Sequence, residues 1–122
     1  MRTAGVLVAG LVLGVAATLA AQNAAGASRR EPQFENATAK AWKSIIMPKQ
    51  PLSFHRHDHS RAIIALTDST LDLVQPSGAK TQNVWQAGKA YWYGPDAPGT
   101  THADVNNTDK PIEVIVVELQ QP

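Results

Sequence analysis

The chain has 122 residues, four histidines and no cysteine, and its formal net charge is +1. This length suits one domain, and the lack of cysteine excludes disulfides and thiolate metal sites. A nearly neutral chain without a long basic run offers little electrostatic attraction to nucleic acid, so we expect no nucleic-acid partner.

The first 27 residues differ in composition from the rest of the chain. A positively charged start precedes an uncharged apolar run from Val6 to Ala21 and then a stretch of small residues. This order is typical of an export signal, with Ala25-Gly26-Ala27 as the cleavage motif. The apolar run is shorter than the ~20 residues that span a bilayer, and an uncleaved membrane anchor is the alternative. We therefore expect a periplasmic or secreted protein, with membrane contact only through an uncleaved segment.

Residues 28–40 are polar and are expected to form a loose lead-in to the domain at residues 41–122. Within the domain, short apolar runs alternate with residues that favour turns, which predicts an all-β fold. About eight strands at roughly ten-residue spacing indicate a sandwich or a barrel. The predicted strands are Ala41–Met47, Leu52–His57, Ala62–Leu66, Thr70–Val74, Thr81–Trp85, Ala90–Tyr93, His102–Asn106 and Ile112–Leu119.

The segment PLSFHRHDHSRAII places His55, His57 and His59 at alternate positions. Alternate side chains of an extended strand point to the same side, so these three imidazoles could share one face and offer nitrogen ligands to a metal. Arg61 is the next residue in the same alternation, and its guanidinium is a permanent cation. A metal-like histidine cluster thus has a positive charge beside it.

Two stretches of the sequence resemble the motifs of the cupin superfamily. Residues 55–68 resemble the first motif, HxH, three or four residues, Glu, six residues, Gly, although Asp68 occupies the place of the closing glycine. Gly88 and the sequence Gly99-Thr-Thr-His102-Ala-Asp-Val-Asn106 resemble the second motif, which ends in G-x2-H-x3-N. The resemblance covers roughly residues 46–119. It implies a small single-domain cupin, which is a double-stranded β-helix or jelly-roll barrel.

The resemblance implies a metal site inside the barrel, with His55, His57 and His102 as ligands. It assigns His59 to a position that is not a ligand, which the alternation alone could not decide. The sequence departs from the first motif at the glutamate ligand, because Arg61 occupies that place. An oxygen ligand that such sites ordinarily have is therefore missing from its usual position.

Three neutral imidazoles can hold Fe, Zn, Mn, Ni or Cu and leave coordination positions open. With Arg61 nearby, two interpretations are possible. Arg61 could turn away from the metal and pair with Asp58, Asp104 or a bound anion. Alternatively, no metal binds, and the histidines and Arg61 bind an anion or a small polar molecule. Asp104 shares the alternation of His102, so it could supply the missing oxygen ligand or neutralise Arg61.

Three classes of function fit this sequence. The first is a metalloenzyme, for which metal-dependent oxygenase chemistry on a small-molecule ligand is the first hypothesis. The second is a binding module without turnover, and the third is an interaction scaffold. Because Ile112–Leu119 is apolar on both faces, we also expect a homodimer. The fold alone does not choose among these functions.

Overall fold

The computed structural model describes residues 26–121, which contain eight strands and no helix. The strands are β1 (Arg29–Glu35), β2 (Ala39–Ile46), β3 (Arg61–Ala65), β4 (Ser69–Val74), β5 (Lys80–Trp85), β6 (Ala90–Tyr93), β7 (Ala103–Val105) and β8 (Ile112–Leu119). The predicted all-β fold is therefore confirmed. Most of the expected signal or anchor segment lies outside the described residues, among which no helix is long and apolar enough to cross a membrane.

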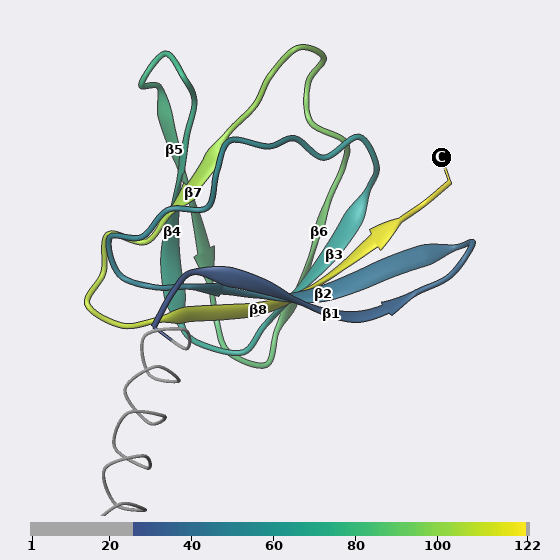
Figure 1. The fold of residues 1–122 in the computed structure, drawn as a ribbon, viewed down its shortest axis with the longest axis horizontal. Coiled ribbons are helices and arrows are strands. Elements are labelled where there is room, and N and C mark those ends of the chain that lie inside the picture. The colour runs from purple at the N-terminus through teal and green to yellow at the C-terminus, as the bar shows by residue number, and fades with distance from the viewer. Residues whose placement is uncertain (1–25, 122) are drawn as a thin grey trace, which may run out of the picture.

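The strands form two antiparallel sheets that enclose a barrel (Figure 1). One sheet has five strands in the order β1-β2-β8-β3-β6, and the other has three in the order β5-β4-β7. The chain changes sheet after β3, β5, β6 and β7, which gives the jelly-roll topology. These crossings bring the loop before β3 and the start of β7 to the same end of the barrel.

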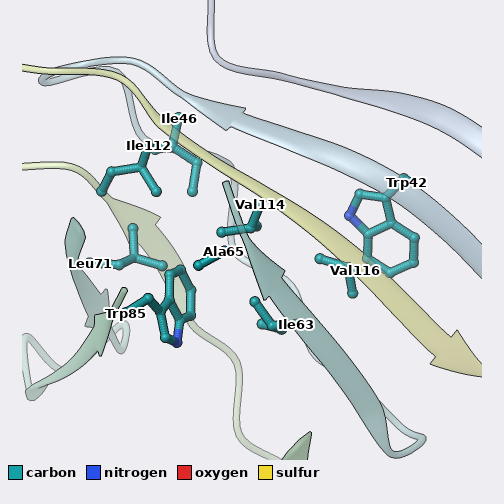
Figure 2. Packing of buried hydrophobic residues seen from close by; sticks show 9 residues of the cluster. All are labelled: Trp42, Ile46, Ile63, Ala65, Leu71, Trp85, Ile112, Val114 and Val116. Carbon is teal, nitrogen blue, oxygen red and sulfur yellow. The ribbon is translucent and has the colours of Figure 1, made fainter. Parts of the chain in front are cut away.

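The core fills the space between the two sheets (Figure 2). β8 runs between β2 and β3, so it is paired along both edges. Its alternate residues Ile112, Val114 and Val116 point inward and are buried, as expected for a strand with one face on the core. The cluster also contains Trp42, Ile46, Ile63, Ala65, Leu71 and Trp85. This apolar core fills one part of the barrel interior, and polar side chains line the remaining part.

The prediction of a loose lead-in at residues 28–40 is wrong, because these residues form β1 and the start of β2. β1 pairs with β2 at the edge of the five-stranded sheet, and most of its side chains are exposed. An edge strand needs no apolar face. The polar composition of β1 therefore gave no strand signal in the sequence. Pro32 lies in this edge strand, where proline is tolerated, and the register shifts just after it.

The predicted strand at Leu52–His57 does not form either. The chain here is extended, but only the single bridge between His55 and His102 is regular pairing. His55 and His102 exchange two backbone hydrogen bonds of 2.9 Å, and the Leu52 amide donates to the carbonyl of Asp104. The segment thus follows β7 without joining its ladder, which leaves the backbone free to turn soon after His57.

A candidate metal centre

Three of the four histidines converge at one end of the barrel. His55 and His57 come from the extended segment before β3, and His102 immediately precedes β7. One ring nitrogen from each lies within 4.8 Å of the other two. The bridge between His55 and His102 fixes two of these residues directly opposite each other, with ring centres 4.6 Å apart. The arrangement has the donor set and the spacing of a site for one metal ion.

His59 does not belong to this cluster in the described structure. The alternation argument grouped it with His55 and His57 because it assumed a regular strand. Instead, the backbone bends at His59, before β3 begins at Arg61. The separation of His59 from the other three agrees with the position that the sequence resemblance gave it.

His55 presents one ring nitrogen to the site without a hydrogen-bond partner. Its Nδ1 lies 2.7 Å from the carbonyl oxygen of Ser53, which can only accept, so Nδ1 carries the proton. Nε2 is then a bare lone pair, and it is buried with no partner among the described residues. An unsatisfied buried polar atom costs about 1–3 kcal/mol. A bound cation would remove that cost.

His57 is held on three sides. Its Nδ1 lies 2.6 Å from Oε1 of Glu118, which comes from the end of β8. Its backbone N–H donates to Oδ2 of Asp96 at 2.7 Å, and its ring stacks parallel to Trp42 at 6.3 Å between centres. A carboxylate that accepts the Nδ1 proton leaves Nε2 available as a ligand and fixes the direction of the ring.

Asp104 lies between the other two imidazoles. Its Oδ1 is 3.6 Å from Nε2 of His102, and its Oδ2 is 3.7 Å from Nε2 of His55. The opposite nitrogen of His102, Nδ1, lies 3.6 Å from Oδ2 of Asp96. Carboxylates therefore flank the His102 ring on both sides.

Arg61 is buried beside the triad, with a side chain only 8% exposed. Its Nη1 donates to the carbonyl oxygen of Gly94 at 3.3 Å and lies 3.7 Å from Oδ1 of Asp96. The guanidinium also lies over the ring of Tyr93. Of the partners that the sequence left open for Arg61, Asp58 is wrong, because its carboxylate pairs with Arg56 at 2.6 Å. Arg61 is thus held by the loop after β6.

Burial favours the neutral form of two imidazoles of the site, His57 and His102. It is the main cause that lowers the pKa of His57 to about 3, and the charge of Arg61 acts in the same direction. Burial also lowers the pKa of His102, which Asp104 partly opposes. The pKa of Glu118 is raised, again chiefly by burial. Neutral imidazoles are the form that binds metals, so the site is ready for a cation at neutral pH.

These shifts predict a pH-dependent stability of the metal-free protein. Below pH 6.5 the unfolded chain takes up a proton on His57, whereas the folded protein does so only near pH 3. The free energy of unfolding in EDTA should therefore fall between pH 6.5 and 3, with this group contributing up to about 1.4 kcal/mol per pH unit. Urea titrations at several pH values measure this slope. His57→Gln should flatten it, whereas an unchanged slope in that variant, or an equal effect of His59→Gln, would contradict the assignment.

The site connects to two spaces of different size. An inner cavity of about 30 Å³ lies inside the barrel against His57, Arg61, His102 and Asp104. A hollow of about 270 Å³ lies outside it, with His102, Asp96 and Lys80 among its lining residues. The inner cavity holds about one water-sized molecule. A small organic ligand would therefore have to approach from the outer hollow.

Two site residues were not found from the sequence, Asp96 and Glu118. Asp96 lies in the loop between β6 and β7, where no periodic pattern marks it. Glu118 did carry a signal, because it shares the inward alternation of Val114 and Val116 on β8. An acidic residue on the core face of an apolar strand indicates a buried partner.

The fold is similar to solved structures of cupin domains. A cupin domain from Bordetella pertussis has a TM-score of 0.68 at 20% identity, over 78% of this chain and 95% of that chain. A double-stranded β-helix protein from Klebsiella pneumoniae has a TM-score of 0.58 at 20% identity, over 78% of each chain. A cupin 2 conserved barrel protein from Salinispora arenicola has a TM-score of 0.53 at 24% identity, over 75% and 74%. The predicted cupin fold is therefore confirmed. No protein-family model and no curated protein matches the sequence.

Proposed function

We propose that this cupin binds one divalent transition metal through His55, His57 and His102. The observation that carries the proposal is Nε2 of His55, a buried lone pair without a partner that belongs to a cluster of three imidazole nitrogens. Imidazole nitrogens suit Fe, Zn, Mn, Ni and Cu. Metal analysis of protein purified without a histidine tag tests the proposal, with one equivalent of bound metal as the expected result.

The charges around the triad support a cation as the ligand. Asp96, Asp104 and Glu118 all act electrostatically on Arg61 from within the site. These three carboxylates and the guanidinium of Arg61 together carry a formal charge of −2. A divalent cation offsets this charge, whereas an anion would meet repulsion from most sides.

The same geometry weighs against the metal-free alternative, in which Arg61 and the histidines bind an anion. Arg61 already contacts Asp96 and the carbonyl oxygen of Gly94, and its side chain is nearly inaccessible. A guanidinium that is to clamp an anion has to present its N–H groups to the ligand. Here Arg61 serves better as a counter-charge for the carboxylates of the site.

The reaction, if the protein is an enzyme, stays unassigned, and metal-dependent oxygenase chemistry is our first hypothesis. A bound metal would supply a Lewis acid with open coordination positions. The chain would contribute a small inner cavity against the triad and a hollow of about 270 Å³ for a small-molecule ligand outside it. The alternative is a metal-binding module without catalysis. It would use the same residues as the enzyme and would differ only in having no turnover. The expected homodimer also stays a prediction.

We further propose that the protein is exported and that the mature form starts at Ser28. The charged start, the apolar run and the small residues before Ser28 motivate this proposal. Expression with export intact, followed by fractionation and mass spectrometry, should give a periplasmic or secreted protein that lacks residues 1–27. An intact N-terminus in a soluble cytoplasmic fraction would reject export, and an intact N-terminus in the membrane fraction would favour the anchor.

A further inference from the structure

The missing oxygen ligand has a candidate on a different strand from the expected one. Asp104 is the second residue of β7, two positions after His102. Its carboxylate places one oxygen 3.6 Å from Nε2 of His102 and the other 3.7 Å from Nε2 of His55. Both contacts are longer than the 2.7–3.2 Å of ordinary N–H···O hydrogen bonds. Hydrogen bonding therefore does not account for the position of this carboxylate.

The protonation of His55 makes the contact with Asp104 unfavourable by itself. Because Nδ1 of His55 carries the proton that is donated to Ser53, Nε2 faces Oδ2 of Asp104 as a second acceptor. Two acceptors that face each other in a buried place repel unless a cation lies between them. The separation of these two atoms is close to that of two ligands of one cation, because ligand atoms about 2.0–2.2 Å from a tetrahedral metal are roughly 3.4 Å apart. Asp104 comes near this distance to His55 and His102, whereas the donors that all lie within 4.8 Å of one another are the three histidines.

His102 lies on the other side of Asp104. Its Nε2 is 3.6 Å from Oδ1 of this carboxylate, and its Nδ1 is 3.6 Å from Oδ2 of Asp96. Arg61, which occupies the usual glutamate position, is occupied with Asp96 and Gly94 and offers no oxygen. A carboxylate ligand of this site would therefore come from another element than β3.

We propose that Asp104 is the fourth protein ligand of the metal and replaces the carboxylate that Arg61 displaces. This inference rests on the proposed metal site. It assigns the ligand set His55, His57, His102 and Asp104, which is three nitrogens and one oxygen. It also assigns Arg61 the role of counter-charge to Asp96 and Glu118, outside the ligand set.

The test compares Asp104→Asn with the wild type and with Asp58→Asn. Asp58 is a suitable control because its carboxylate lies in the same loop as His57 but pairs with Arg56 at the surface. Calorimetric titration gives the Zn²⁺ affinity, and the visible absorption of the Co²⁺-loaded proteins reports the ligand set. We expect Asp104→Asn to lower the Zn²⁺ affinity at least about 10-fold. Losing a residue that only hydrogen-bonds to a ligand already lowers metal affinity about 10–100-fold. The Co²⁺ spectrum should change with it, and Asp58→Asn should alter neither.

Metal-free stability separates ligation from a structural role. Removing one of two repelling acceptors should leave Asp104→Asn at least as resistant to urea in EDTA as the wild type. Loss of stability in EDTA would overturn the proposal, as would wild-type Zn²⁺ affinity or an unchanged Co²⁺ spectrum in this variant. If the wild type itself binds no metal, the proposed function fails, and the ligand assignment falls with it.

Discussion

Replacing His57 by alanine is expected to lower the affinity for Zn²⁺ by more than about 100-fold, because even partners outside the ligand set change metal affinity 10–100-fold. The residue is 8% exposed, its ring direction is fixed by Glu118 and Trp42, and it is one of the three clustered imidazoles. Its loss leaves two imidazoles that cannot enclose the ion from the third side. Isothermal titration with Zn²⁺ on untagged protein measures the effect.

His59→Ala is the matched control, because His59 lies two residues further along the same segment and outside the cluster. It should bind Zn²⁺ like the wild type. His55→Ala should lower the Zn²⁺ affinity in the same way. Because His55 is less buried than His57, this second variant shows whether the loss in His57→Ala comes from misfolding. Equal Zn²⁺ affinity in the wild type, His57→Ala and His55→Ala would show that the triad does not hold the metal.

Replacing Arg61 by methionine should destabilise the metal-free protein by about 3–5 kcal/mol, the usual cost of breaking a buried ion pair by removing one partner. Arg61 is 6% exposed, and Asp96, Glu118 and Asp104 all act on its charge. Without it these carboxylates repel one another in a poorly solvated place. Urea unfolding in EDTA measures the loss.

The same Arg61→Met change should increase the stabilisation that Zn²⁺ gives, since it removes a cation from beside the ion. Lys43→Met serves as the control, because Lys43 pairs with Glu113 at 3.0 Å on a partly exposed surface. A surface pair of this kind contributes about 0–1 kcal/mol. If Arg61→Met is as stable in EDTA as Lys43→Met, the buried carboxylates do not depend on Arg61.

The sequence predicted most of the barrel strands because their signal is local. Strands such as β3 and β8 are short apolar runs that end at turn residues, so each can be recognised without its neighbours. β1 was missed because an edge strand is held by backbone hydrogen bonds to β2 and needs no apolar face. Leu52–His57 was over-predicted because an extended segment and a paired strand look alike until the partner strand is known.

For the site, the sequence by itself determined the donors, namely the spacing of His55 and His57, the presence of His102 and the arginine at position 61. Only the tertiary structure decided which groups surround them. Glu118 and Asp96 are separated from His57 by 61 and 39 residues, so only the closed barrel brings them to it. The distances from Asp104 to Nε2 of His55 and of His102 also depend on how β7 lies against the His55 segment. Residue types set the chemistry that is possible, whereas contacts between distant parts of the chain set protonation, charge balance and ligand direction.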